Sequence, residues 1–170
     1  MKFKICTEAD LDTLVNIALR SYLDHYTYLW TDAGKEYIQA NFSYNTMREE
    51  LANSNSIFYF IYLQDTIVGY LKINIDRAIG HYSSEEALEL ERIYILKEAT
   101  GKGSGTRVID FVIDLAREKL KTMVWLKAME SSAAVAFYEK HKFIITDAYN
   151  LTFPTMKEEY RKILVMCRVI

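Results

Sequence analysis

The spacing of apolar residues along the chain distinguishes two kinds of segment. Short apolar runs rich in β-branched and aromatic residues predict strands, and they lie at residues 2–6, 57–63, 67–75, 87–95, 122–127, 143–150 and 162–170. Segments whose apolar residues recur every three or four positions predict helices, and they lie at residues 11–22, 34–53 (in one or two pieces), 105–121 and 132–141. Residues 23–34 and 76–86 form irregular or polar connections.

The connections between these elements predict the topology of the sheet. Gln64-Asp65-Thr66 turns one strand back on the next, and the last two strands form a second hairpin. Strand 87–95, helix 105–121 and strand 122–127 form a parallel βαβ unit, because the helix returns the chain in the same direction. We therefore predict an α+β (α/β) fold with a mostly antiparallel, mixed seven-stranded sheet around this central unit. With 170 residues and no linker, the chain fits one domain over residues 1–170.

Composition and charge narrow the class of function. The formal net charge is −2, which gives no electrostatic case for binding nucleic acid. The sequence has no apolar run that approaches the ~20 residues of a membrane span, and its first residues do not have the pattern of a signal peptide. Cys6 and Cys167 lie far apart without metal-ligand spacing, so we expect two buried free thiols and no metal site. These features favour a cytoplasmic protein without membrane or nucleic-acid partners.

A glycine-rich turn follows the strand at 87–95 and precedes a helix. Its glycines stand at alternate positions, Gly101, Gly103 and Gly105. Glycine tolerates positive φ and lets another group approach the backbone closely. The helix that follows presents unpaired N–H groups and the positive end of its dipole. The turn therefore predicts a site for a phosphate-bearing ligand.

Two common phosphate-binding patterns do not fit this turn. A P-loop requires glycine where Leu96 stands, and Ser or Thr in place of Gly103. A dinucleotide fingerprint requires glycine at Thr106 or Val108, and an acidic residue near positions 121–124, which read Lys-Thr-Met-Val. A different phosphate-binding loop is therefore needed.

The pattern x-x-Gly-x-Gly after a strand resembles the acetyl-CoA pyrophosphate loop of the GNAT family, the GCN5-related N-acetyltransferases. Family members usually have Arg/Gln-x-x-Gly-x-Gly/Ala, whereas this chain has Thr100 at the first position, so one phosphate-facing side chain is lost and Lys102 is its candidate replacement. The resemblance implies acetyl-CoA as cofactor and helices on both faces of the sheet. It assigns the pyrophosphate to Gly101, Lys102, Gly103, Ser104, Gly105 and Thr106.

A second segment, residues 130–143, resembles the family pattern Asn-x-x-Ala-x-x-Phe-Tyr-x-Lys-x-Gly-Phe. Ser131 stands where Asn usually contacts the pantetheine arm, and Lys142 replaces the usual Gly. The resemblance implies that Tyr138 lies near the CoA sulfur and protonates the leaving thiolate. The alternative for Tyr138 is an aromatic residue packed under the helix. The positions that match the pattern are Ala134, Phe137, Tyr138, Lys140 and Phe143.

Two acidic residues, Glu89 and Glu91, interrupt an otherwise apolar strand. Because side chains alternate along a strand, both face the same side, and a buried carboxylate is costly without a partner or a role. The resemblance implies a general base in this strand, Glu91 first and Glu89 in reserve. Alternatively, the acids form surface ion pairs with Arg92 or Lys72. The family also pairs the pantetheine arm, like an added strand, with the backbone of Ile93, Tyr94 and Ile95.

Three segments indicate which class of amine would accept the acetyl group. Residues 58–62, 69–76 and 88–95 look like the PaiA-like group of bacterial spermidine and spermine acetyltransferases. A polyamine favours an acidic, aromatic-lined cleft. We select Tyr26, Trp30 and Glu85 for such a cleft, from a larger set that includes Tyr22, Asp24, Tyr28, Asp32 and Glu86. The alternative is that these aromatic residues cap the core and the acids form a solvated face.

The leading hypothesis is therefore an enzyme that transfers an acetyl group from acetyl-CoA to a small-molecule primary amine, with a polyamine as the expected acceptor. A protein N-terminal or lysine acetyltransferase is the second hypothesis. The third is a regulator that senses acetyl-CoA without turnover. A homodimer is compatible with each of them.

Overall fold

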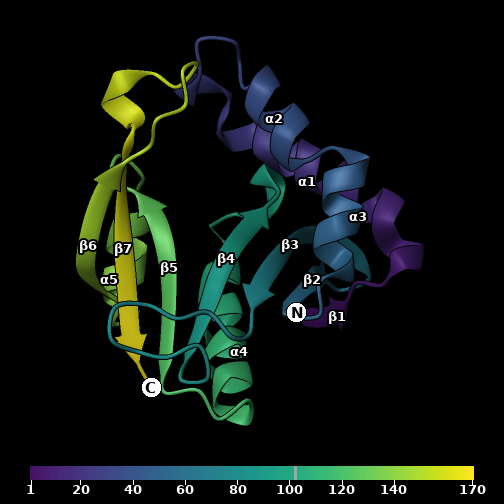
Figure 1. Ribbon diagram of the computed structural model, residues 1–170. Helices are drawn as coiled ribbons and strands as arrows, with labels where there is room; N and C mark the ends of the chain where they lie inside the picture. The colour runs from purple at the N-terminus through teal and green to yellow at the C-terminus, as the bar shows by residue number, and fades with distance from the viewer. Residues whose placement is uncertain (102) are drawn as a thin grey trace. The chain divides into compact units, whose positions relative to one another are not determined.

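The computed structural model describes residues 1–101 and 103–170. Its strands are β1 (Lys2–Ile5), β2 (Ser56–Leu63), β3 (Thr66–Asn74), β4 (Ala87–Ile95), β5 (Met123–Met129), β6 (Ile144–Asn150) and β7 (Lys162–Val169). Its α-helices are α1 (Leu11–His25), α2 (Lys35–Asn41), α3 (Tyr44–Ala52), α4 (Ser104–Glu118) and α5 (Ala134–Lys140). The predicted order of elements is confirmed, and the helical region at 34–53 consists of two helices (Figure 1).

The strands form a sheet in the order β1-β2-β3-β4-β5-β7-β6. β4 and β5 are parallel, with Glu89 opposite Trp125, because α4 lies between them in the sequence and returns the chain. The β1–β2, β5–β7 and β6–β7 pairs are antiparallel. This mixed, mostly antiparallel sheet confirms the predicted α+β fold.

The chain divides into two compact units, and we describe each by itself. The first comprises residues 1–73 and 92–104, and the second residues 74–91 and 105–170. In the first unit, α3 packs on both α1 and β2. The side chains buried in this unit include Leu14, Ala18, Met47, Phe58 and Phe60.

The second unit is built on β5, β7 and β6. β7 lies between the other two strands, so that Cys167 is opposite Trp125 on one side and Ile144 on the other. α5 packs against β5, as Figure 1 shows. A buried cluster forms around Trp125, and Ile79 and Tyr82 from the connection at 76–86 pack against it; its members are Ala87, Met123, Trp125, Val165 and Cys167.

Several helix ends differ from the prediction by one to three residues, and two of the differences have a visible local reason. α4 ends at Glu118 rather than at 121, because Leu120 has a φ of 58°. A positive φ is incompatible with a right-handed α-helix. α5 begins at Ala134 rather than at 132, because Ser132 Oγ accepts a hydrogen bond from the Ala134 N–H at 3.1 Å. α1 continues three residues beyond the predicted face, to His25.

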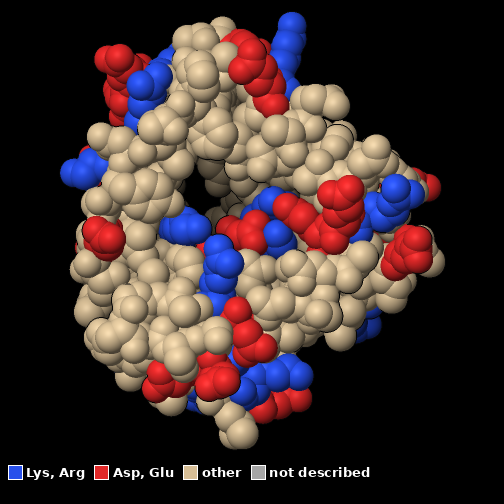
Figure 2. Space-filling model, in the orientation of Figure 1, with Lys and Arg blue, Asp and Glu red and all other residues tan. Residues whose placement is uncertain are grey.

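The two cysteines, Cys6 and Cys167, are buried and free, as predicted. Burial raises the pKa of the Cys6 thiol to about 12. Among the described residues, no helix is long and apolar enough to cross a membrane. The same residues contain no group of three or more His, Cys, Asp or Glu side chains that could hold a metal ion. Acidic and basic side chains are intermixed on the face shown in Figure 2.

Candidate active site

The glycine-rich turn lies between the end of β4 and the first residue of α4. A single 3₁₀ turn, Lys97–Ala99, leads into it. Gly101 and Gly103 both have a φ of 75°, and a Cβ atom built on either would meet no described atom within 4 Å. The positive φ explains the choice of glycine, and the open space leaves the backbone accessible to a ligand. Lys102, a predicted pyrophosphate contact, lies outside the described residues.

Two residues fix the start of α4. Ser104 is buried, and its Oγ donates to the carbonyl oxygen of Ala99 at 3.1 Å. Gly105 serves close packing, because an added Cβ would lie 2.9 Å from the ring of Phe137 in α5. The first N–H groups of a helix have no partner within the helix. This end of α4 therefore suits a diphosphate, as the sequence predicts.

α5 carries the second sequence motif. Tyr138 is half-buried, and its ring packs edge-on against Phe137 and Phe143, with ring centroids 5.4 and 5.8 Å away. Just beyond the helix, His141 Nε2 lies 3.2 Å from Oγ1 of Thr106 in the first turn of α4. The motif therefore brings an aromatic hydroxyl and an imidazole to the same part of the second unit.

The two departures from the family pattern flank α5. Ser131 is exposed in the turn before the helix. Lys142 follows the helix with a φ of 65°. This is the left-handed region, in which glycine is the least strained residue. The backbone conformation thus accounts for the glycine that the family pattern has at the position of Lys142.

Glu89 and Glu91 lie on the same face of β4, as predicted. The evidence is that the side-chain amide of one residue, Asn74, binds both carboxylates. Asn74 Nδ2 donates to Glu89 Oε2 at 2.8 Å and to Glu91 Oε2 at 2.7 Å. Glu89 is 2% exposed. Its Oε1 lies 3.2 Å from the Lys127 ammonium group and its Oε2 lies 3.7 Å from Nε of Arg77. The buried charge of Glu89 is therefore balanced by cations.

Glu91 is half-buried, so its carboxylate is more accessible to an acceptor amine than that of Glu89. This difference supports the predicted order, in which Glu91 is the first candidate for the base. The cations that the sequence offered as partners, Arg92 and Lys72, both bind Glu50 of α3 in the first unit. Arg92 does so through two bonds of 2.7 and 2.8 Å, and Lys72 at 3.2 Å.

The carboxyl-terminal end of β4 has unusual backbone surroundings. Gly69 of β3 lies so close that an added Cβ would be 2.2 Å from the carbonyl oxygen of Tyr94. The N–H of Leu96 donates to the carbonyl oxygen of Val68 at 2.8 Å. Nε2 of a histidine, His25 at the end of α1, lies 3.0 Å from the carbonyl oxygen of Ile95, one of the groups predicted to face the pantetheine arm.

The residues selected for an acceptor cleft have different surroundings. Trp30 is 4% exposed, and its indole N–H donates to the hydroxyl of Tyr22 at 2.7 Å. Tyr26 is half-buried and stacks on Tyr22, and burial raises its pKa. Glu85, in the second unit, is exposed, and its carbonyl oxygen accepts a bond of 2.8 Å from the Lys121 ammonium group. The surroundings of Trp30 favour the core alternative for that residue.

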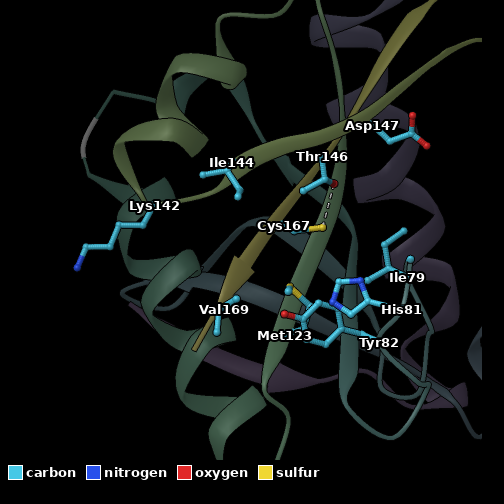
Figure 3. Close-up of a pocket in the computed structure, with 11 residues that line it drawn as sticks. Ile79, His81, Tyr82, Met123, Lys142, Ile144, Thr146, Asp147, Cys167 and Val169 are labelled. Atoms are coloured by element: carbon cyan, nitrogen blue, oxygen red, sulfur yellow. Dashed lines mark hydrogen bonds between the residues drawn. The ribbon is translucent and has the colours of Figure 1, made fainter.

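The second unit also contains a cavity of about 680 Å³. It is mainly apolar, and the charged ends of Lys142 and Asp147 point away from it (Figure 3). A hydrogen bond joins Thr146 Oγ1 and Cys167 Sγ at 3.3 Å in its wall. The described lining residues include none of the predicted catalytic or cofactor-contacting positions; apolar members are Ile79, Tyr82, Met123, Ile144 and Val169.

Comparison with known proteins identifies the family. Residues 15–143 match the model of the acetyltransferase (GNAT) family, which is more than half of the chain. The chain belongs to the GNAT family. Its general activity is therefore N-acetyl transfer, and the cofactor of these acetyltransferases is acetyl-CoA. The open glycine backbone and the start of α4 fit the phosphate end of that cofactor.

Three similar proteins differ from this acetyltransferase at most positions of the sequence. An uncharacterized N-acetyltransferase from Lactobacillus delbrueckii subsp. lactis is 25% identical over 154 residues, which cover 83% of this chain and 87% of the relative. The PaiA N-acetyltransferase of Thermoplasma acidophilum, solved with coenzyme A, is 20% identical with a TM-score of 0.75, and each chain is covered fully, 100%. A ribosomal-protein-alanine N-acetyltransferase from Brucella melitensis is 18% identical with a TM-score of 0.66 and the same 100% coverage.

Proposed function

We propose that the chain, as one acetyltransferase domain over residues 1–170, acetylates a small primary amine, with a polyamine such as spermidine or spermine as the acceptor. The observation that carries this proposal is the half-buried carboxylate of Glu91 beside the buried, cation-balanced carboxylate of Glu89. An amine must lose a proton before it attacks a thioester, and an accessible carboxylate can take that proton. The free, buried thiols of Cys6 and Cys167 also fit a reducing compartment such as the cytoplasm.

The first-choice catalytic residues and the predicted cofactor contacts have defined tasks in this proposal. Acetyl-CoA supplies the acyl group and a thiol leaving group. Glu91 accepts a proton from the ammonium group of the acceptor, directly or through water, and the hydroxyl of Tyr138 donates a proton to the sulfur. The cofactor is held by Ile93, Tyr94 and Ile95, by Gly101, Lys102, Gly103, Ser104, Gly105 and Thr106, and by Ser131.

The polyamine assignment is supported by exposed acidic side chains and by likeness of fold. Asp24 and Glu85 are exposed, Asp32 is half-buried, and all three would attract a polycation. Hydrogen bonds from the backbone N–H groups of Glu36 and Gly34 lower the pKa of Asp32, which keeps this carboxylate charged. The PaiA structure shares the fold over the whole chain. The Brucella protein has the same fold, and its name refers to a ribosomal-protein alanine. For this reason a protein N-terminus remains the second candidate acceptor for the present chain.

An assay of the free thiol released from acetyl-CoA tests the proposal. The candidate acceptors are spermidine, spermine, amino acids, aminoglycosides and peptides. We expect the highest kcat/KM with a polyamine, and a decrease as salt is added, because acidic side chains are screened over about 10 Å at about 0.1 M salt. The matched control is Tyr138→Phe, which keeps the ring and should lower turnover by about 10²-fold while CoA still binds.

The other outcomes separate the alternatives. Turnover of peptides but not of free amines would assign the chain to protein acetylation. Turnover of another small amine would keep the enzyme and remove the polyamine. CoA binding without turnover of any acceptor would favour the sensing regulator.

A further inference from the structure

The carboxyl-terminal turns of α1 contact one short segment, residues 95–98, which joins β4 to the glycine-rich turn. His25 Nε2 lies 3.0 Å from the carbonyl oxygen of Ile95. Because a carbonyl oxygen can only accept, this nitrogen carries the hydrogen and donates. The carboxylate of Asp24 accepts a bond of 3.3 Å from the N–H of Lys97. Two adjacent side chains of one helix therefore hold two backbone groups of one segment.

A third contact continues this row along α1. Arg20, one helical turn before Asp24, forms an ion pair with Glu98. Both side chains are more than half exposed, at 59% and 55%, so this pair contributes little to stability. The three contacts together form an anchor between α1 and residues 95–98, and its main bond is that of His25, which is partly buried.

The bond from His25 completes the hydrogen bonding of one peptide group. The N–H of Leu96 already donates to the carbonyl oxygen of Val68 in β3 at 2.8 Å. The carbonyl oxygen of Ile95, on the same peptide group, accepts from His25. This peptide is thus held from β3 on one side and from α1 on the other, which fixes its orientation.

The turn that follows depends on such anchors. Gly101 and Gly103 have no side chains and stand in open surroundings, so they cannot fix the turn by packing. Inside the segment, Thr100 Oγ1 donates to the carbonyl oxygen of Lys97 at 2.8 Å and so tightens the 3₁₀ turn. The direction in which the chain enters this 3₁₀ turn is therefore set at Ile95, while the bond from Ser104 to Ala99 holds its far end.

We propose that His25 is a positioning residue for the cofactor. It acts through the Ile95–Leu96 peptide, and it sets the geometry of the strand end and of the turn beyond without touching the cofactor itself. The proposal rests on the proposed function of that turn. It makes α1 a determinant of CoA affinity, although α1 contains none of the family motifs.

Two variants of one residue test this role by calorimetric titration of the full chain with CoA. His25→Phe keeps an aromatic ring beside Tyr26 but has no N–H, so we expect the Kd to rise by about tenfold. His25→Gln restores an N–H donor and should stay within about threefold of the wild type. Hydrogen exchange in the cofactor-free protein should become faster in His25→Phe at residues 95–104, with melting temperature nearly unchanged.

The control is His81→Phe, which removes an exposed histidine from the connection at 76–86 and should change neither measurement. If His25→Phe does not fold, Asp24→Ala tests the same anchor at an exposed position, with about a threefold rise in Kd expected. The proposal would be overturned if His25→Phe had the CoA affinity and the hydrogen exchange of the wild type. It would also be overturned if His25→Gln bound CoA as weakly as His25→Phe. Wild-type protein that binds no CoA would remove the proposed function, while the exchange measurement would still decide the role of His25.

Discussion

Glu89 and Glu91 are two residues apart on β4, and their surroundings suit them to different tasks. Glu89 is enclosed and bound to Lys127 and Arg77, so its charge is already balanced. Glu91 shares Asn74 with it but is half-buried. A carboxylate that remains accessible is the better proton acceptor for an incoming amine.

We predict that Glu91→Gln lowers kcat/KM most near neutral pH and is partly rescued at high pH. Glutamine preserves size and hydrogen bonding, but it cannot take a proton from an amine whose pKa is near ~10. The measurement is the pH profile of kcat/KM with the best acceptor. The control is Glu89→Gln, which should lower the melting temperature and leave the shape of the profile unchanged. A Glu91→Gln enzyme with the wild-type profile would move the base to Glu89 or to bulk water.

Lys142 is the second residue with a testable consequence, and it concerns stability. Its φ of 65° is a left-handed conformation that costs a side-chain-bearing residue roughly 1–2 kcal/mol. We predict that Lys142→Gly stabilises the protein by about 1 kcal/mol in urea unfolding, since glycine adopts this conformation without strain. Lys140→Gly, at the last position of α5, should instead destabilise it by about 1 kcal/mol. Equal destabilisation by both variants would contradict the argument.

At the scale of elements, the glycine-rich turn joins a strand to a helix and leaves its backbone open. We predict that Gly103→Val weakens CoA binding by at least about tenfold, because a branched side chain would occupy the space that the backbone offers to the pyrophosphate. The control is Gly80→Val. Gly80 also has positive φ, 57°, and open surroundings, so the strain is similar but lies outside the turn. Calorimetry that finds equal CoA affinity in both folded variants would refute the cofactor assignment.

A second element-scale feature is the ionic link between α3 and strands β3 and β4 in the first unit. Glu50 binds both Arg92 and Lys72, whose side chains are only 9% and 6% exposed. The rings of Phe42 and Phe58 lie under the two cations, 5.5 and 5.6 Å away. The link is therefore largely removed from solvent.

We predict that Glu50→Gln destabilises the protein by about 3 kcal/mol, because it removes the carboxylate that two poorly hydrated cations share. Urea unfolding measures this change. Asp114→Asn, which breaks an exposed pair with Arg117, should cost less than about 1 kcal/mol. A Glu50→Gln variant as stable as Asp114→Asn would show that solvent reaches the link.

At the scale of the whole molecule, hydrophobic periodicity was sufficient to predict most of the helices and strands and their order. β4 was predicted with its observed bounds, Ala87–Ile95, because a polar connection and a polar turn enclose one apolar run. The ends of α4 and α5 were less accurate, since they depend on a left-handed residue at 120 and on the hydroxyl of Ser132. Such features concern single residues and leave no periodic signal.

The candidate site was predictable where its chemistry is local in sequence, as in the glycine-rich turn and the paired acids of β4. Its supporting contacts come from distant segments. His25 is 70 residues from Ile95, and Asn74 is 15 residues from Glu89. The surroundings of Trp30 were missed although its partner is near in sequence: Tyr22, eight residues earlier, accepts the indole N–H in the core, across a segment that has no regular periodicity. Motifs point to candidate reacting groups, whereas the side chains that contact these groups follow from the fold.

The two buried thiols have a practical consequence for following the motions of the molecule. Cys6 belongs to the first unit and Cys167 to the second, so each unit contains one natural chemical reporter. A thiol reacts as the thiolate, and burial holds the Cys6 pKa near 12, so alkylation of the native protein must await local opening. Mass spectrometry of separately alkylated peptides then times the opening of each unit, without any engineered label.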